Sequence, residues 1–480
     1  MKNIDFKSLI KSDKGRSLVL NLPCSEDERL FFNGYQSWTT SKELVPTDVM
    51  LGAHKLPSFV VNHWGIDRYG DYHFMDYSEQ PGVFHGFSYC YRRSGDQYLL
   101  IGSTDESDGY TIFEYDASKE ELVIRKDSEN DVHIFIAEGY EDEVFDGWFK
   151  AMKVKPRPAK PLTGYSSWYN RYEKISERTI MEDLAGCENV LAEGDLFQID
   201  DGWEAAIGDW SAHPGKFPGG MKKCADEIHA KGYLAGLWLA PFVVGAKSKL
   251  IKEHPDWLLQ HDGKPWFCGC NWGGFYSLDI DNEEVQTYLE KVFDRVFNEW
   301  GYDLVKLDFL YAAAPWPNEE TGESRGERMC RAVDMLRYFC KDKLILGCGV
   351  PLWPAFGVFD YCRIGCDVGL DWNNSWIMQR TNNERVSTKN SIANTYYRRE
   401  LNGRAFLNDP DVFFLRNNNI KLNNDKKILL ARVNAQYGGI LLTSDNMGTY
   451  DSNQIKTYNE LRELWRDKSW TDLDFLKDLN

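Results

Sequence analysis

From Pro161 onward the chain alternates short apolar runs with amphipathic segments, and this alternation restricts the fold more than any other feature. Such a pattern is typical of parallel βαβ units, in which helices cover the faces of a parallel sheet. Eight runs have the composition of buried strands: TGYSSWY, DLFQIDD, YLAGLWLAPF, DLVKLDFL, LILGCG, YCRIGCD, RAFLNDPD and GGILLTSD. Eight units in one domain of this size predict a (β/α)8 TIM barrel. An open doubly wound sheet is disfavoured because no glycine-rich phosphate loop follows the first strand.

The first third of the chain has a different pattern. Short alternating runs such as SLVLNL, QYLLIGS and GYTIFEY are separated by Gly, Asp, Asn and Ser, which predicts an antiparallel β-sandwich. The run KVKPRPAKP then breaks regular structure, because each proline fixes φ and restricts the residue before it. We therefore expect a β-sandwich domain over residues 1–155, a catalytic barrel over 156–446 and a C-terminal helical tail over 447–480. A C-terminal β-domain is expected to be short or absent.

Charge and cysteine content exclude several classes of partner. The formal net charge is −18, whereas proteins that bind nucleic acids or anionic membranes normally present a concentrated basic face. The sequence also has neither the apolar core of a signal peptide nor an apolar stretch long enough for a membrane helix. Eleven cysteines, an odd number in a large chain, indicate buried thiols in a reducing compartment. We expect a cytoplasmic protein with no nucleic-acid or membrane partner.

Metal and cofactor sites are not expected either. Cys268 and Cys270 form a close pair, but no histidine lies near them at the spacing of zinc ligands. All nine histidines lie at or before His261, so the second half of the chain cannot supply a histidine ligand or a Ser-His-Asp triad. Chemistry in that half must therefore depend on carboxylates.

Carboxylates do follow several predicted strands. Asp200 and Asp201 end one strand, and Asp308, Asp367 and Asp409 end three others. The active site of a barrel enzyme lies at the C-terminal ends of its strands. Asp308 and Asp367 are separated by about two βα units, which places them on the fourth and sixth strands across the barrel mouth. Two such carboxyl groups suit a retaining glycosidase, with one as nucleophile and the other as acid/base.

Neighbouring charges assign the roles. Lys306 lies two residues before Asp308 on the same face of the strand, so its charge is expected to keep Asp308 ionised. Arg363 lies four residues before Asp367 and is expected to donate hydrogen bonds to a sugar hydroxyl. Asp367 must begin protonated to act as the acid, which requires partial burial beside the charge of Asp308.

Other residues have a structural alternative. A bend at the strand end could turn both Asp200 and Asp201 toward a sugar, although one of them could instead cap a helix or pair with an arginine. Asp409, between Asn408 and Pro410, is also typical of a turn. Five tryptophans are candidate stacking platforms, although a single tryptophan more often fills a core: Trp38, Trp64, Trp168, Trp203 and Trp238.

Taken together, the motifs GYSSWYNRY, FQIDDGWE, IGDW, FPGGM, LWLAPF, VKLDFLYAAA, LILGCGVPLWPA and RIGCD resemble glycoside hydrolase family 36, whose members include α-galactosidases. The resemblance extends from about residue 33 to about residue 445. It implies a retaining, exo-acting α-galactosidase that needs no cofactor and acts on small α-galactosides. Asp308 would be the nucleophile and Asp367 the acid/base. The remaining implied roles are sugar hydroxyl binding by Asp200, Asp201, Lys306 and Arg363, a platform from Trp238, support of the nucleophile by Tyr169, and a pocket lip from Trp38 and Trp64.

The chain departs from the family pattern at Cys366 and in its short or absent C-terminal β-domain, and three alternative functions stay open. Cys366 stands where the family usually has proline, so the loop beside Asp367 is expected to differ in shape. An α-N-acetylgalactosaminidase could use the same scaffold, and the loops near Cys348 and Arg363 would decide between the two sugars. A galactosyl transferase would share the covalent intermediate, and a sugar-binding protein would share only the pocket. The sequence leaves a homo-oligomeric state open.

Overall fold

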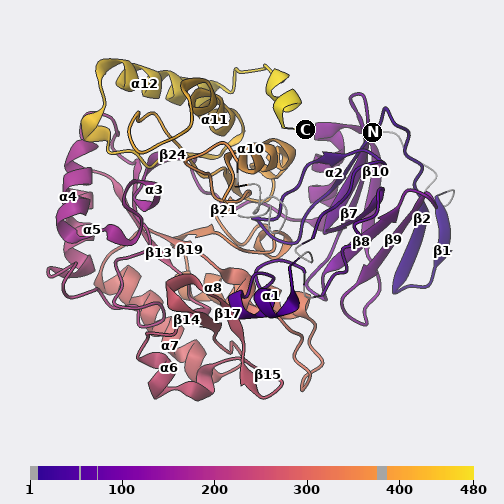
Figure 1. Cartoon of the computed structure of the whole chain (residues 1–480), viewed down its shortest axis with the longest axis horizontal. Helices are drawn as coiled ribbons and strands as arrows, with labels where there is room; N and C mark the ends of the chain where they lie inside the picture. The colour runs from indigo at the N-terminus through magenta and orange to yellow at the C-terminus, as the bar shows by residue number, and fades with distance from the viewer. Residues whose placement is uncertain (1–8, 53–55, 73, 374, 376–385, 480) are drawn as a thin grey trace.

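The computed structural model describes residues 9–479 except 53–55, 73, 374 and 376–385. Two bodies lie side by side: a twisted β-sandwich formed by the N-terminal part of the chain, and a larger barrel surrounded by helices (Figure 1). The predicted order of an antiparallel sandwich followed by a TIM barrel is confirmed. The exact boundaries at residues 155 and 446 stay predictions.

Each sheet of the sandwich has five antiparallel strands. The first has the order β1 (Ile10–Asp13), β2 (Ser17–Asn21), β9 (Glu121–Lys126), β8 (Thr111–Asp116) and β5 (Val83–Phe87). The second has the order β10 (Ile134–Tyr140), β7 (Gln97–Ser103), β6 (Tyr89–Ser94), β3 (Arg29–Phe32) and β4 (Glu43–Leu44). Alternate residues point inward, and Leu20, Leu122 and Ile124 are at most 1% exposed between the sheets. Helix α2 (Glu141–Met152) packs on β10 and β7 with Trp148 buried.

The barrel consists of parallel strands whose order matches eight βα units. Neighbouring strands follow the order β22, β21, β20, β19, β13, β12, β11, β24, β23. Their bounds are β11 Leu162–Ser166, β12 Leu196–Ile199, β13 Leu234–Leu239, β19 Leu304–Leu307, β20 Leu344–Gly347, β21 Tyr361–Arg363, β22 Leu407–Asp409, β23 Val412–Phe413 and β24 Ile440–Thr443. All eight predicted strands are present, although several are shorter than their sequence runs.

The seventh predicted strand is split in two. Its first piece, β22, pairs with β21, and its second piece, β23, pairs with β24, so the ring closes through the break. Pro410 lacks the N–H that a central strand needs, and Asp411 has φ +71°, outside the extended region. The break therefore has a local cause, and it turns Asp411 away from the regular ladder.

Helices cover the outside of the barrel, as the sequence predicts. The principal ones are α4 (Glu177–Gly186), α5 (Gly220–Ala230), α7 (Glu283–Asp294), α8 (Arg325–Cys340), α10 (Thr388–Tyr397) and α11 (Asn424–Tyr437). In α7, Val285, Leu289 and Val292 are buried at helical spacing, and Ser324 caps α8 in a capping box with Glu327. Between β20 and β21 the chain forms only the short 3-10 helix Trp353–Ala355, so one barrel helix is reduced.

An insertion after β13 builds one wall of the barrel mouth. It contains a three-stranded sheet of β14 (Val243–Gly245), β18 (Phe275–Ser277) and β17 (Phe267–Gly269), and a hairpin of β15 (Gln260–His261) and β16 (Lys264–Pro265). The insertion also contains the short helix α6 (Leu250–Glu253). Helix α1 (Ser58–Trp64), from the N-terminal part of the chain, lies beside this insertion (Figure 1), and Cys270 Sγ lies 3.7 Å from the carbonyl oxygen of His63.

The C-terminal part forms helix α12 (Ser452–Asp467), which packs on α11, followed by the 3-10 helix Asp474–Asp478. Within the described ranges, no helix combines the length and the apolar character needed to cross a membrane.

Candidate active site

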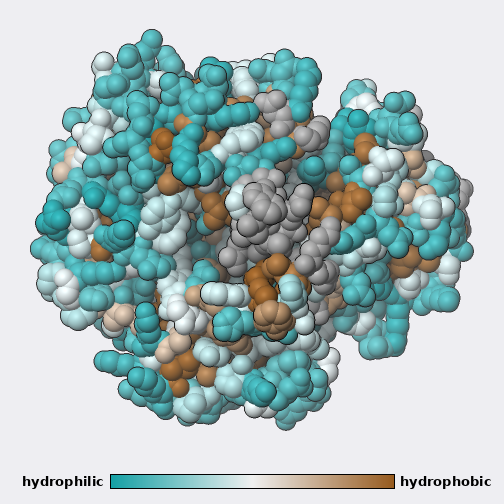
Figure 2. Space-filling model, viewed as in Figure 1, coloured by the Kyte–Doolittle hydropathy of each residue, from teal (hydrophilic) through white to brown (hydrophobic). Residues whose placement is uncertain are grey.

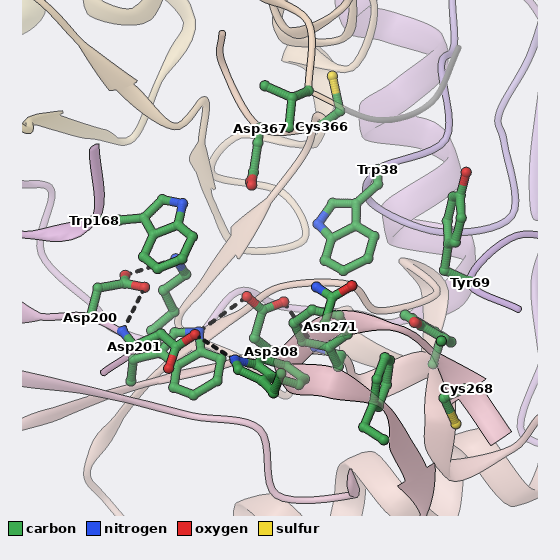
Figure 3. A pocket seen from close by; sticks show the side chains of 18 of the residues that line it. Trp38, Tyr69, Trp168, Asp200, Asp201, Cys268, Asn271, Asp308, Cys366 and Asp367 are labelled. Atoms are coloured by element: carbon green, nitrogen blue, oxygen red, sulfur yellow. Dashed lines mark hydrogen bonds and ion pairs between the residues drawn. The ribbon is translucent and has the colours of Figure 1, made fainter. Parts of the chain in front are cut away.

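A cavity of about 330 Å³ opens at the C-terminal end of the barrel strands. Its lining combines carboxylates, one lysine and several aromatic rings from the barrel, the insertion and the sandwich side. The lining includes Trp38, Tyr69, Trp168, Asp200, Asp201, Trp238, Asn271, Trp272, Lys306, Asp308, Phe309, Cys366 and Asp367. In Figure 3, Asp367 points down into the space between Trp168 and Trp38, and Asp308 lies at the base. Acids and flat rings around one hollow suit a neutral polyhydroxylated ligand.

Asp308 lies one residue beyond β19 and is 8% exposed. Trp238 Nε1 donates to its Oδ2 at 3.1 Å, and the Phe309 amide donates to its Oδ1 at 2.8 Å. Burial raises the pKa of Asp308, and the charge of Asp367 adds to this rise, whereas Lys306 and the two hydrogen bonds oppose it. These donors stabilise the carboxylate form in a buried position, as a nucleophile requires.

Lys306 makes a different contact from the one predicted. Its Nζ pairs with Asp200 Oδ2 at 2.9 Å, although its charge also acts on the nearby Asp308. Gln198 Nε2 donates to the same oxygen of Asp200 at 2.8 Å. The lysine therefore holds the Asp200 side chain in place through an ion pair, and only secondarily favours the ionised form of Asp308.

Asp201 lines the same cavity as Asp200, because strand β12 ends at Ile199 and the chain bends there. Its Oδ2 accepts a hydrogen bond from Trp272 Nε1 at 2.8 Å. Glu204, three residues further, is 7% exposed and accepts the Gly202 amide at 3.2 Å. The tandem acids thus both face the hollow, and each has its own set of partners.

Asp367 is not at a strand end. Strand β21 ends at Arg363, so Asp367 lies four residues further on, in a loop. Its side chain is 36% exposed, and Arg363 Nη1 donates to its Oδ1 at 2.8 Å. The backbone carbonyl of Asp367 accepts the Ser387 amide at 2.9 Å. The expected Arg363 contact to a sugar is replaced here by a contact to the acid, and Arg363 does not line the cavity.

A buried carboxylate that the sequence did not single out supports this loop. Asp411, at the break in the seventh strand, accepts from Arg363 Nη2 at 2.9 Å and from the Val368 amide at 2.8 Å. Tyr169 donates to Asp411 at 2.6 Å, so this tyrosine supports the Asp367 loop and makes no hydrogen bond to Asp308. Burial and neighbouring acids raise the pKa of Asp411 to about 6, against the opposing charge of Arg363.

Asp409 has a structural contact as well. It is 2% exposed, and its Oδ2 lies 3.3 Å from Arg363 Nε. Its Oδ1 accepts the Asp411 amide at 2.9 Å. Arg363 is therefore surrounded by three carboxylates and acts as an anchor for the loop that carries Asp367.

Among the predicted aromatic residues, Trp238 is 2% exposed and points its indole N–H at Asp308, in place of the free stacking face expected of a platform. Trp38 lines the cavity, and its Nε1 lies 3.3 Å from Cys348 Sγ, which places the buried Cys348 behind the wall. Trp203 is fully buried and belongs to the core.

Trp64 is not part of the cavity lining; its neighbour Gly65 is. Trp64 is 52% exposed and Phe59 on the same helix is 73% exposed. Figure 2 shows an apolar patch at the position of α1, beside the barrel mouth. The predicted role of Trp64 as a lip of the pocket is therefore not supported by this arrangement of the chain.

The main residues that the sequence did not reveal are Trp272, Asp411 and Glu204. Trp272 lies in the insertion at the barrel mouth and contacts Asp201 across 71 residues of sequence, so no local pattern signals this pairing. Asp411 follows the sequence NDP, which signals a turn. Within the part of the chain that is described, no group of three or more His, Cys, Asp or Glu side chains has the arrangement of a metal site.

Comparisons with known proteins agree with this geometry. Residues 161–338 match the Melibiase family model. An α-galactosidase of Lactobacillus acidophilus is 32% identical over 148 residues, which is 29% of this chain and 20% of that protein. The matched segments thus span only about a fifth of the length of such curated relatives.

Solved structures match over much more of the chain. The α-galactosidase of Thermus thermophilus in complex with p-nitrophenyl α-D-galactopyranoside is 29% identical, with a TM-score of 0.78, and the match covers 93% of this chain and 88% of that one. Its complex with stachyose gives a TM-score of 0.79 at 28% identity and covers 94% and 95%. A family 36 α-galactosidase of Geobacillus stearothermophilus, 14% identical with a TM-score of 0.63, shares the fold over 94% of this chain and 62% of its own.

Proposed function

We propose that this chain, a relative of the α-galactosidases of glycoside hydrolase family 36, removes terminal α-linked galactose with retention of configuration. The observation that carries the proposal is the pair of carboxyl groups, Asp308 and Asp367, that face one cavity at the C-terminal end of a TIM barrel. The two acids are close enough for the charge of Asp367 to affect the pKa of Asp308. Paired acids of this kind perform double displacement.

In the first step, an oxygen of Asp308 attacks the anomeric carbon and the bond from that carbon to the leaving oxygen breaks. Asp367 transfers its proton to the leaving oxygen, so the aglycone departs as a neutral alcohol. The product is a galactosyl ester of Asp308. Trp238 and the Phe309 amide hold the attacking carboxylate in one orientation before the step.

In the second step, Asp367, now ionised, takes a proton from water while the water oxygen attacks the anomeric carbon. The ester bond to Asp308 breaks and the carboxylate is restored. The partial exposure of Asp367 leaves room for both the leaving group and the incoming water. Two inversions at one carbon give net retention.

Recognition of the sugar depends on the acids at the base. Asp200, paired with Lys306, and Asp201, bonded to Trp272, offer acceptors for neighbouring hydroxyl groups. Trp168 and Trp38, on opposite sides of the hollow, offer apolar faces to the ring or the aglycone (Figure 3). Lys306 and Asp308 lie within the same hollow, so a single pyranose can contact binding and reacting groups together.

The deciding experiment compares p-nitrophenyl α-galactoside with p-nitrophenyl α-N-acetylgalactosaminide, without added metal or NAD. We expect hydrolysis of the galactoside, with the α-anomer of galactose released first in a proton NMR time course. Faster hydrolysis of the acetamido sugar would identify the protein as an α-N-acetylgalactosaminidase. If neither substrate is hydrolysed, the proposed hydrolase function is contradicted, and the transferase and sugar-binding functions remain. The proposal also includes the cytoplasmic location and the homo-oligomeric state named from the sequence.

A further inference from the structure

Two buried acids at the edge of the cavity are in contact with each other. Asp201 is 4% exposed and Glu204 is 7% exposed, and their side chains are within hydrogen-bonding reach of each other. Ionised carboxylates only accept hydrogen bonds, so two of them can bond to each other only if one carries a proton. Like charges at such a short distance in a buried site also cannot both ionise at modest cost.

No described lysine, arginine or histidine forms an ion pair with Asp201 or Glu204 that could replace the proton between them. Among the described side chains, neither Asp201 nor Glu204 forms an ion pair, whereas the neighbouring Asp200 takes the charge of Lys306. The other nearby cation, Lys216, directs its Nζ to the carbonyl oxygens of Glu173 and Gly202, at 2.8 and 3.0 Å. Its charge lowers the pKa of Glu204 without an ion pair to it.

A second observation points the same way. Asp201 Oδ2 has a donor, Trp272 Nε1, but Asp201 Oδ1 is buried and accepts no hydrogen bond from an N–H group or a hydroxyl among the described residues. A buried carboxylate oxygen without a donor costs free energy. A proton shared between this acid and Glu204 offsets that cost, because it adds a hydrogen-bond donor to the Asp201 carboxyl group.

We propose that Asp201 and Glu204 share one proton, so that Glu204 is a positioning residue that keeps Asp201 uncharged beside the bound sugar. The inference rests on the proposed function, because it assigns the pair to the galactose side of that site. The tandem acids then differ: Asp200 is paired with the charge of Lys306, whereas Asp201 is the protonated half of a singly charged acid pair and is held by Trp272 and Glu204.

The shared proton gives the site an upper pH limit. Burial, followed by the negative charge of Glu204, raises the pKa of Asp201 to about 9, and Asp200 adds to this rise while the Trp272 hydrogen bond opposes it. Above that pH the pair becomes two adjacent anions, which repel each other and disturb the Trp272 contact. If only the protonated pair binds the sugar, KM rises about tenfold for each further pH unit.

The first test needs no activity. Infrared spectra of the full chain at neutral pH are recorded for the wild type, Glu204→Gln and Asp201→Asn. In each variant an amide N–H replaces the shared proton, so the wild type minus variant difference should contain the band of a protonated carboxyl group. Glu106→Gln is the positive reference: Glu106 is a buried acid of the sandwich with its pKa raised to about 8, so its own difference spectrum should contain a protonated carboxyl band while the Asp201–Glu204 pair is retained. Difference spectra without that band in both cavity variants would overturn the shared proton.

The second test measures thermal unfolding against pH. Because the folded-state pKa of Asp201 lies above the value in the unfolded chain, the pair contributes stability that is present at acidic pH and lost as the pH rises toward about 9. The Tm of the wild type relative to Glu204→Gln should therefore fall across that window. A constant Tm difference would contradict the proposal.

The third test uses p-nitrophenyl α-galactoside. KM of the wild type should rise above about pH 9, whereas KM of Glu204→Gln should stay within twofold of its neutral value, because no shared proton remains to be lost. An identical rise in the variant would overturn the positioning role. If neither protein hydrolyses the substrate at any pH, the proposed function fails, and the infrared and Tm results still decide the shared proton.

Discussion

Asp308 and Asp367 face the same cavity but are supported by different kinds of structure. Asp308 follows β19 by one residue, in the middle of the barrel sheet, and two short hydrogen bonds fix its carboxylate. Asp367 lies on a loop four residues beyond β21, is 36% exposed, and is held through Arg363. A nucleophile meets the same anomeric carbon in every substrate, whereas an acid must reach leaving groups of different shape. The buried support of Asp308 and the loop support of Asp367 suit the nucleophile and acid/base roles that we propose for them.

The largest effect is expected when the rigidly held acid is neutralised. Asp308→Asn keeps the shape of the side chain but removes the attacking carboxylate, so kcat/KM should fall by more than about 10⁴-fold. The measurement is hydrolysis of p-nitrophenyl α-galactoside. Asp303→Asn is the matched control, because Asp303 precedes the same strand at its far end and binds His229 and the Ala235 amide. Activity near wild type in Asp308→Asn would refute the nucleophile.

The loop acid should give a smaller effect that depends on the leaving group. For Asp367→Asn we expect a loss of about 10²- to 10⁴-fold with an unactivated oligosaccharide, because no proton reaches the leaving oxygen. With p-nitrophenyl α-galactoside the glycosylation step needs little protonation and should lose less. Asp371→Asn, in the same loop and paired with Lys421 at the surface, serves as the control. An equal loss on both substrates would contradict the acid role.

Removing a buried contact of Arg363 tests how far the position of Asp367 depends on the support of its loop. Asp411→Asn removes a buried partner of Arg363, so kcat/KM should fall by about 10- to 100-fold through misplacement of Asp367. The variant should also lose stability, because Arg363 keeps one partner fewer.

The pH dependence of that loss has a definite sign. The pKa of Asp411 is raised to about 6, above the value in an unfolded chain, so its contribution to stability is present at acidic pH and is lost as the pH rises through about 6. The Tm deficit of Asp411→Asn should therefore shrink between about pH 4 and pH 7. Thermal unfolding of both proteins across this range provides the measurement, and a deficit that grows with pH would show that another group titrates.

The smallest effect concerns the orientation of the nucleophile. Trp238→Phe removes the N–H that donates to Asp308, so its pKa should rise and the acidic limb of the kcat/KM profile should move to higher pH. We expect a loss of about tenfold at neutral pH. Trp210→Phe is the control, since Trp210 is equally buried beside Trp238 and its Nε1 has no hydrogen-bond partner among the described residues. The same shift in both variants would point to a packing effect.

The contrast between Asp308 and Asp367 also shows which parts of the site could be predicted from the sequence. Apolar runs revealed all eight barrel strands, and the position of Asp308 within VKLDFL, directly after the strand, followed from the same pattern. The shape of the loop beyond β21 was harder to predict from the sequence, because it depends on Asp411. The contact between Asp411 and Arg363 joins segments that are 48 residues apart. Trp272 and Asp201 meet across 71 residues for a similar reason. Local patterns predict elements, whereas pairings between loops depend on tertiary packing.

The closure of the barrel has a consequence for how the chain is made. Strand β11, near the start of the barrel, pairs with β24 near its end, so Leu162 lies opposite Ile440. The ribosome must therefore synthesise the chain as far as β24 before β11 can pair with its second neighbouring strand. Until then an apolar parallel edge stays open, in a fold whose long-range contacts already slow its formation. Synthesis of this protein should depend strongly on chaperones that shield such edges during translation.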